Sequence, residues 1–307
     1  MTPRRIAVTG SSGFIGSNLV AALSSRGDVA VPVKRPFEAS ALRALFADVD
    51  AVVHLAGVVS AIHPREYFAA NVDAAIIVAG AARDSGKPML HVSSLAAAGP
   101  APSWAPRVED DECRPVNDYG RSKLEGERRV LATEGLRCTV LRPGVVYGPG
   151  DRALLPLFRY ARGGILPLVG DPRAAYTFIY VEDFLRVIFA ALERGLPTDV
   201  LFAGHERPVG ARDLLEAVKR TSGAAAAIVP VPRLLVRGAA LAGDAIGSLS
   251  GKPATINSRR FVELYSTGFV CRTDRLRTHL GITAQVELNE GLERTVHWYR
   301  ERGWLRG

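Results

Sequence analysis

Short apolar runs alternate with amphipathic stretches through the first half of the chain. In residues 14–25, Ile15, Leu19 and Leu23 recur on one face at helical spacing. Further helical patterns occupy residues 71–83 and 119–133, and runs of strand length lie at residues 6–9, 29–33, 51–56, 89–93 and 138–142. Strands that alternate with helices in this way form a parallel sheet with helices on both faces. The pattern therefore predicts an α/β fold with a doubly wound parallel sheet.

The pattern changes after Gly148, where proline and glycine become frequent as far as Asp171. A strand followed by a helix is expected at residues 178–192, and another strand at residues 200–203. The rest of the chain is predicted to form helices and loops. We therefore expect one sheet domain over residues 1–150, to which residues 177–203 return. A smaller, mostly helical region should comprise residues 151–176 and 204–307.

Composition and charge narrow the function classes. The 307 residues include 39 lysines and arginines and 31 aspartates and glutamates, a net charge of +8 that is spread along the chain. Nucleic-acid binding would need clustered basic residues with interleaved aromatic side chains. The sequence contains no such cluster, so the predicted partner is a small anionic molecule and no nucleic acid.

Cysteine and histidine usage indicates the compartment and argues against a metal. Cys113, Cys138 and Cys271 form no CxxC pair, and three cysteines fit no closed disulfide set. A reducing, cytoplasmic compartment is therefore expected. The histidines show no metal-ligand spacing. No apolar run approaches the length of a membrane span, and the N-terminus has no long apolar region typical of a signal peptide.

A glycine-rich turn links the first expected strand to the first helix. Gly10, Gly13 and Gly16 permit a tight turn and a close backbone approach to a pyrophosphate, which the N-terminus of the helix would also attract. A turn without a ligand is the alternative. The position within a strand–turn–helix unit favours a dinucleotide and a Rossmann-type sheet. The residues expected to bind it here are Gly10, Ser12, Gly13, Phe14, Ile15 and Gly16.

The end of the second expected strand bears on the choice of dinucleotide. An acidic residue at this place would bind the adenosine ribose and favour NAD. The chain has Lys34 and Arg35 instead, and no acid before Glu38. The two basic side chains predict a 2′-phosphate and thus NADP, with NAD as the alternative. They are also compatible with solvated surface charges.

Tyr119 and Lys123 stand four positions apart at the start of an expected helix, so they share one face. A phenol with a pKa of about 10 is a poor base at neutral pH, and a nearby ammonium group lowers that pKa. The pair could then move a proton on or off a substrate oxygen. A surface pair is the alternative, because this spacing is common.

Ser93 and Ser94 end a predicted central strand. The carboxyl edge of a parallel sheet is where ligands bind in this architecture. A serine hydroxyl there could orient a substrate oxygen beside Tyr119, or it could merely cap a loop. Together these features predict a site at which a proton moves on or off a substrate oxygen.

With these motifs the chain resembles the extended short-chain dehydrogenase/reductase family, which includes NAD(P)-dependent sugar epimerases, dehydratases and 3β-hydroxysteroid-type dehydrogenases. The resemblance covers nearly the whole chain and depends on six motifs in order. They lie at residues 9–16, 50–57, 91–94, 119–123, 141–150 and 178–183.

The resemblance implies roles for individual residues. Ser94, rather than Ser93, would join Tyr119 and Lys123 as a catalytic residue. In the family the catalytic serine stands five residues before a glycine, which Gly99 matches here. Lys123 would also hold the nicotinamide ribose. Further cofactor contacts would come from Leu55, Ala56, Gly57, Asn71, Pro143, Val145 and Val146. A homodimer is usual for the family and is expected here.

The chain departs from the family pattern in three places. The short distance from Val33 to Ala51 indicates that an outer strand is missing, and Pro32 supports this because proline is tolerated at a sheet edge. Val145 stands where many nucleotide-sugar enzymes have asparagine. Residues 176–177 replace an Arg-Asp pair, so a diphosphate anchor would have to come from elsewhere; the candidates are Arg152, Arg173 and Arg259.

These departures weaken the nucleotide-sugar interpretation. The predicted function, as the resemblance implies, is an NAD(P)-dependent oxidoreductase or epimerase that transfers a hydride at a secondary alcohol or ketone while Tyr119 carries the proton. A nucleotide-linked sugar is one candidate substrate. The first alternative is a reductase or dehydrogenase of a hydrophobic 3-oxo or 3β-hydroxy compound. The second is a non-catalytic regulator that senses a dinucleotide. The mostly apolar residues 234–249 are either a substrate lid or a packed helix.

Overall fold

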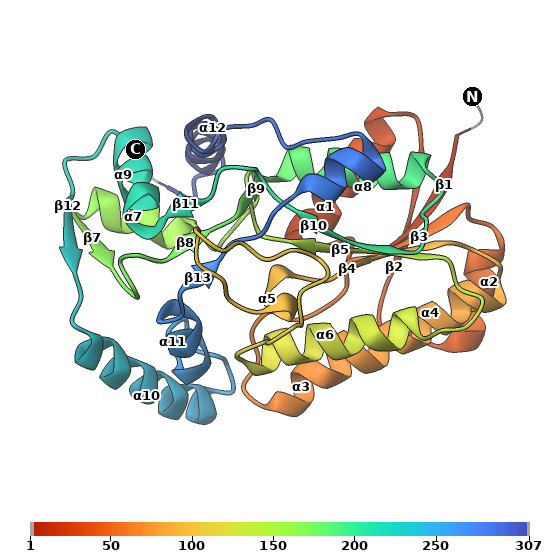
Figure 1. Ribbon diagram of the computed structural model, residues 1–307, viewed down its shortest axis with the longest axis horizontal. Coiled ribbons are helices and arrows are strands. Elements are labelled where there is room, and N and C mark those ends of the chain that lie inside the picture. Colours follow the sequence, from red (N-terminus) through yellow and green to blue (C-terminus); the bar gives the residue numbers. More distant parts are fainter. Residues whose placement is uncertain (1–2, 306–307) are drawn as a thin grey trace.

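A six-stranded parallel sheet forms the centre of the computed structural model, which describes residues 3–305 (Figure 1). The strand order is β10-β5-β4-β3-β1-β2. The strands are β1 (Arg5–Thr9), β2 (Val29–Val33), β3 (Ala51–His54), β4 (Met89–Val92), β5 (Cys138–Pro143) and β10 (Asp199–Ala203). The predicted doubly wound α/β fold is confirmed.

Helices cover both faces of this sheet because successive strand residues point to opposite sides. Ile6, Val8 and Val53 pack in a core with helices α1 (Phe14–Ser25) and α8 (Val181–Glu193). Ala7 and Val52 pack in the opposite core, whose helices are α2 (Ala39–Ala47), α4 (Ala74–Asp84) and α6 (Asp118–Leu131). The strands are therefore apolar along nearly their whole length.

Strand β2 is the border of the sheet, and no strand within residues 3–305 pairs with its outer side, as expected for a missing outer strand. Pro32 lies opposite Val8 in the register. The N–H of Val29 donates to the carbonyl of Arg4 at 2.7 Å, so odd-numbered residues of β2 face β1 and Pro32 faces outward. The proline therefore removes no hydrogen bond from the ladder.

The remaining strands form small sheets beside the central one. Strands β6 (Val145–Tyr147) and β9 (Phe178–Tyr180) pair, as do β7 (Ile165–Leu168) and β12 (Ala227–Pro230). A three-stranded sheet joins β8 (Ala175–Tyr176), β11 (Val209–Gly210) and β13 (Gly268–Phe269). The helices of this region are α7 (Leu155–Arg162), α9 (Ala211–Ser222), α10 (Arg233–Ser250), α11 (Ser258–Leu264) and α12 (Leu288–Glu301), with the π-helix η2 (Leu276–Leu280).

The helix expected at residues 71–83 is interrupted. Helix α3 (Pro64–Phe68) leads into η1 (Ala69–Asp73), a π-helical turn, and then into α4. Periodicity could not predict this turn, because the apolar and small residues around it fit a continuous helix equally well. A short helix, α5 (Leu95–Ala98), also follows β4, and Ser94 caps it. Both features adjoin the candidate site.

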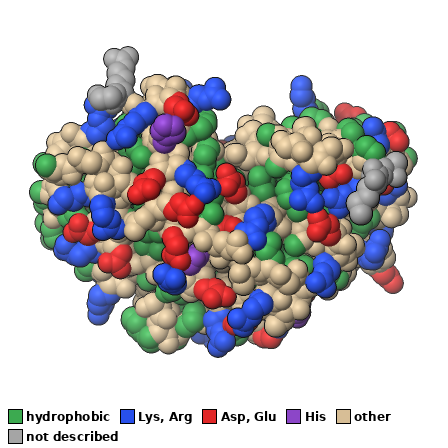
Figure 2. Space-filling model, turned by 90° about the horizontal axis from the view of Figure 1, so that it is seen from above, with side chains coloured by type: hydrophobic (Ala, Val, Ile, Leu, Met, Phe, Trp, Pro, Cys, Tyr) green, Lys and Arg blue, Asp and Glu red, His purple; other side chains and the backbone are tan. Residues whose placement is uncertain are grey.

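Charges of both signs are interspersed over the face in Figure 2, with no large patch of one sign. Within residues 3–305, no helix combines the length and apolarity that crossing a membrane requires.

Candidate active site

The candidate site forms where the carboxyl ends of β1, β3 and β4 meet the start of α1 and α6. Gly10 follows β1 with a φ of 67°, a left-handed conformation that favours glycine. A β-carbon on Gly16 would lie 2.1 Å from the carbonyl oxygen of Gly10, so only glycine allows α1 to pack against the turn. Gly13, by contrast, faces open space except for the Gly10 oxygen at 3.3 Å.

Thr9 and Asn71 fix the backbone that follows β3. The Thr9 hydroxyl accepts hydrogen bonds from the N–H groups of Leu55 and Ala56, both at 3.2 Å. Asn71 accepts from the N–H of Val58 at 2.9 Å and donates to its carbonyl at 3.1 Å. The predicted contact segment 55–57 is thus held rigidly beside the glycine turn.

Tyr119 is placed by close packing of α6 on α5. Asn117 caps α6 by accepting from the N–H of Gly120 at 2.9 Å. A side-chain hydrogen bond joins Tyr119 to Ser94, the residue that caps α5. Burial raises the pKa of Tyr119 to about 12, while the bond to Ser94 acts in the opposite direction. The phenol is therefore protonated at neutral pH.

Lys123 is buried one turn further along α6. Its Nζ donates to the carbonyl of Val92 at 2.7 Å. Burial lowers the pKa of Lys123 to about 8, and Glu127 offsets part of this effect. The sequence predicted that Lys123 would lower the pKa of Tyr119. The structure gives the opposite direction for Tyr119, because burial of the phenol dominates and the ammonium group is bound to Val92.

The sequence did not reveal a buried ion pair behind Lys123. Arg142 donates to Glu127 through Nε at 3.0 Å and through Nη2 at 2.6 Å. Ser93 also donates to Glu127, so its hydroxyl points away from Tyr119. The sequence did offer one indication of a charged contact at this place, since Glu127 lies one helical turn after Lys123. Nothing in the sequence indicated that Arg142, on a strand, would meet it.

Two histidines lie beneath the site, on the face of the sheet that α4 and α6 cover. The rings of His54 and His91 stack with centroids 5.4 Å apart. Burial lowers the pKa of His54 to about 3 and that of His91 well below its usual value. Both rings are therefore neutral at pH 7, and both are buried in the core beneath the site. No group of three or more His, Cys, Asp or Glu side chains in the described range could hold a metal ion.

The remaining predicted cofactor residues lie at the rim. Lys34 and Arg35 are exposed just after β2, and Arg35 donates to the carbonyl of Ala70 at 3.4 Å. Pro143 ends β5, while Val145 and Val146 continue into β6 and stay partly accessible. The predicted residues therefore lie at or just after the carboxyl ends of β1 to β5, or on η1 and α6.

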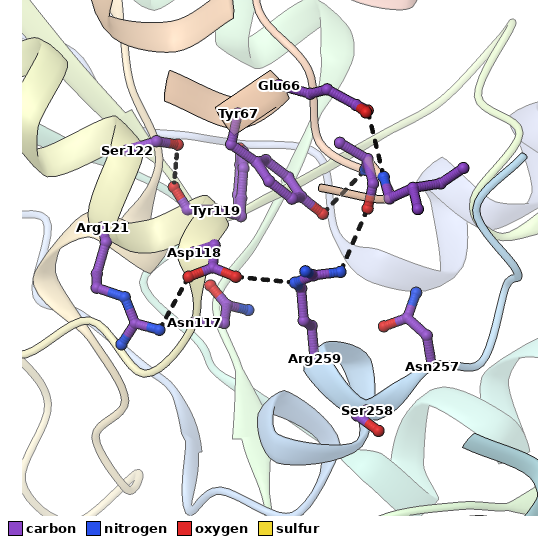
Figure 3. Close-up of polar contacts among 12 residues, drawn as sticks. Glu66, Tyr67, Asn117, Asp118, Tyr119, Arg121, Ser122, Asn257, Ser258 and Arg259 are labelled. Carbon is purple, nitrogen blue, oxygen red and sulfur yellow. Dashed lines mark hydrogen bonds and ion pairs between the residues drawn. The ribbon is translucent and has the colours of Figure 1, made fainter. Parts of the chain in front are cut away.

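Figure 3 shows how α11 reaches the start of α6. Arg259 donates through Nε to Oδ2 of Asp118 at 2.8 Å, and through Nη1 to the carbonyl of Ala61 at 3.5 Å. Tyr67 lies between Ala61 and Tyr119. Its hydroxyl accepts from the N–H of Ala61 at 3.0 Å, and its ring centroid lies 6.4 Å from that of Tyr119. These contacts connect the C-terminal region to the candidate catalytic tyrosine.

A pocket of about 330 Å³ opens beside these contacts. It lies between α10, α11 and the loop after β3. Its lining includes Ala61, Ile62, Gly243, Gly247, Asn257 and Arg259. The pocket adjoins Arg259, whose partner Asp118 directly precedes Tyr119 in the chain.

Comparison with known families decides the class of this site. A family model described as NAD dependent epimerase/dehydratase family matches residues 6–204, more than half of the chain. The chain belongs to this family. It is an NAD(P)-dependent enzyme of the extended short-chain dehydrogenase/reductase type, as the sequence motifs implied.

Individual members of the family are similar along the whole chain. A ceramide reductase from Caulobacter vibrioides is 29% identical, with 98% of this chain and 96% of the relative covered. A 4-hydroxy-2-methyl-3-oxo-4-farnesyl-3,4-dihydroquinoline-1-oxide ketoreductase from Stigmatella aurantiaca is 28% identical, with 94% and 95% covered. The structure of DesIV, a dTDP-glucose 4,6-dehydratase from Streptomyces venezuelae with NAD and TYD bound, has a TM-score of 0.78 at 23% identity and covers 98% and 99% of the two chains.

The glycine turn fits the dinucleotide that the family uses. No side chain caps the start of α1 at Gly13, so the first turn of the helix presents its N–H groups to a ligand. A β-carbon at Gly13 would project into the space in front of this turn. The family's NAD(P) dependence and the residues present therefore agree.

Proposed function

We propose that the protein is an NADP-dependent reductase of a ketone on a hydrophobic substrate. The observation that carries the proposal is the placement of Tyr119 beside Ser94 and one turn before the buried Lys123, at the carboxyl edge of the sheet. A phenol that keeps its proton at neutral pH is ready to act as an acid. Reduction of a ketone needs an acid, whereas oxidation of an alcohol needs a base.

Three residues supply the proton chemistry. Ser94 would donate a hydrogen bond to the ketone oxygen, and Tyr119 would give its proton to the same oxygen. When bound, a reduced nicotinamide supplies the hydride, so that a carbonyl, a hydride and a proton yield a secondary alcohol. The ammonium group of Lys123 would stabilise the phenolate left on Tyr119 and hold ribose hydroxyls. Proton return to Tyr119 from solvent closes the cycle.

The proposed substrate class follows from the arginines that could have anchored a diphosphate. Arg173 pairs with Asp171 at 3.1 Å, and Arg152 lies over the ring of Trp304 with Cζ 5.0 Å from its centroid. Arg259 lies at the pocket but pairs with Asp118. Each of the three arginines already has a partner in the protein. Thr177, one of the two residues that replace the Arg-Asp pair, is buried against Cys271. A ceramide reductase and a farnesylated-quinoline ketoreductase among the relatives support a hydrophobic substrate.

Lys34 and Arg35 support NADP over NAD. Both side chains are exposed after the edge strand, and no further strand in the described part of the chain covers them. A 2′-phosphate placed there could take charge-assisted hydrogen bonds from both.

The test is turnover by the purified protein with NADPH, followed by nicotinamide absorbance. Ketones that carry a long acyl or isoprenoid chain are compared with UDP-glucose and dTDP-glucose. We expect oxidation of NADPH only with the hydrophobic ketones, and a fall of at least about 100-fold in kcat for Tyr119→Phe. Turnover restricted to nucleotide sugars would refute the substrate class, and an unchanged rate in the Tyr119 variant would refute the mechanism.

A further inference from the structure

Helix α10 has two opposite faces, of which only one contacts the rest of the protein. Val236, Ala240, Gly243 and Gly247 form the buried face. The large apolar residues on the other side are exposed: Leu234, Leu235, Leu241, Ile246 and Leu249. At about 100° per residue these five positions fall within one continuous arc of roughly 140°. The helix therefore presents an uninterrupted apolar stripe, here called the α10 outer face.

The exposure of this face is unusual in degree. Leu234 is 79% exposed and Leu249 is 89% exposed. Single exposed leucines are common on protein surfaces, but contiguous ones mark a contact site. Figure 1 places α10 at the outer border of the molecule, beside α11. The outer face is therefore available to something outside this chain.

The charges around the outer face are positive. Arg237 and Lys252 are exposed, and neither forms an ion pair with an acidic residue within 3–305. The single acid of α10, Asp244, is turned inward, where it accepts from the N–H of Ser258 at 3.3 Å. Arg233 lies over the rings of Phe261 and Tyr265, with Cζ 5.7 and 5.1 Å from their centroids.

We propose that the α10 outer face docks the protein on the surface of an anionic phospholipid bilayer. The exposed leucines and Ile246 enter the boundary between head groups and acyl chains, and Arg237 and Lys252 contact lipid phosphates. A second copy of the chain is the competing occupant. Symmetric pairing of two outer faces would bring like charges together, which disfavours it.

This docking would place the pocket between α10 and Ala61 next to the bilayer. The small residues Gly243 and Gly247 separate the pocket from the outer face by the width of one helix. A substrate dissolved in the bilayer would then have a short path to Tyr119. The docking itself does not rest on the proposed reaction, so the two can fail independently.

The test is co-sedimentation of the full chain with vesicles. Vesicles of phosphatidylcholine and phosphatidylglycerol in equal amounts are compared with vesicles of phosphatidylcholine alone. We expect the protein to bind the anionic vesicles at least tenfold more tightly than the neutral ones. Binding to the anionic vesicles should fall as salt screens the charges. The double variant Leu234→Glu/Leu241→Glu should lose at least tenfold in binding. Arg237→Gln/Lys252→Gln should lower binding to anionic vesicles alone.

A matched control adds the same two charges elsewhere. Trp104→Glu/Tyr160→Glu alters exposed aromatic residues outside α10 and should bind as the unmodified chain does. Equal binding by the α10 variant, or no binding by the unmodified chain, would overturn the proposal. So would light scattering that finds a dimer which the Leu234→Glu/Leu241→Glu variant dissociates, since the outer face would then be an interface between copies. Reductase activity on a detergent-solubilised ketone reports on the proposed function separately.

Discussion

Gly120 packs against Ala96 so closely that a β-carbon on the glycine would lie 2.4 Å from the alanine carbonyl oxygen. This contact sets the distance between α6 and α5, and with it the approach of Tyr119 to Ser94. A side chain at position 120 must push the two helices apart.

Gly120→Ala should therefore destabilise the protein and misplace the phenol. We expect a loss of about 1–3 kcal/mol in the free energy of unfolding, as for other overpacked sites, and a fall in kcat. Urea unfolding and steady-state kinetics measure the two effects. Gly80→Ala on α4 is the matched control, because no atom lies within 4 Å of its new β-carbon. That variant should be neutral or slightly more stable. Equal stability of the two variants would contradict the packing argument.

The buried ion pair of Glu127 and Arg142 should be important for the stability of the fold. Glu127→Gln leaves the Arg142 charge buried without its partner, which typically costs about 3–5 kcal/mol. Glu125→Gln on the same helix breaks only an exposed pair with Arg129 and should change stability by less than about 1 kcal/mol. Denaturant unfolding of both variants provides the comparison. A Glu127 variant as stable as the Glu125 variant would show that the buried pair is not required.

The Lys123 ammonium group should impose a pH limit. Its pKa of about 8 lies below the usual lysine value of 10.5 because of burial. Between these two values the unfolded chain binds more protons, so the contribution of Lys123 to stability rises with pH. Activity should move in the opposite direction, falling above about pH 8 as the ammonium group is lost. A pH profile of kcat that stays flat to pH 10 would contradict a role for the charge. Lys123→Met should remove the pH-dependent rise in stability.

Lys34 and Arg35 should determine cofactor preference. Lys34→Ala/Arg35→Ala removes both proposed partners of a 2′-phosphate, each bond contributing about 1.5–3 kcal/mol. We expect KM for NADPH to rise at least tenfold while KM for NADH stays unchanged. Equal effects on both cofactors would mean that the two side chains do not read the phosphate. Lys87→Ala changes a basic residue outside the glycine turn and the end of β2, and serves as the control for net charge.

Local rules predicted the sheet and its border from the sequence. The alternation of apolar runs gave each central strand, and Pro32 together with the short Val33–Ala51 connection indicated the missing outer strand. These features are local, since each depends on residues that are neighbours along the chain. The selection of Ser94 over Ser93 agrees with the geometry, because Ser93 is bonded to Glu127 and Ser94 to Tyr119. The catalytic and cofactor roles themselves stay predictions, as do the homodimer and the compartment.

Other features depended on contacts between distant segments. Arg142 and Glu127 are charged residues that a sequence places on the surface by default, and their burial follows only from pairing. The apolar pattern of residues 234–249 allowed a packed helix or a lid, but periodicity does not reveal which face a helix leaves uncovered. The direction of the Tyr119 pKa was likewise set by burial, which spacing along α6 cannot indicate.

Pro32 also guards against fibrillar assembly. The unpaired N–H and C=O groups of an edge strand can form hydrogen bonds with a strand of another chain, which leads to aggregation. Because the proline faces outward, an incoming strand would meet a gap in the row of donors at the middle of β2, next to the positive charges of Lys34 and Arg35. Pro32 and the two basic residues therefore disfavour edge-to-edge aggregation, although the outer strand is missing.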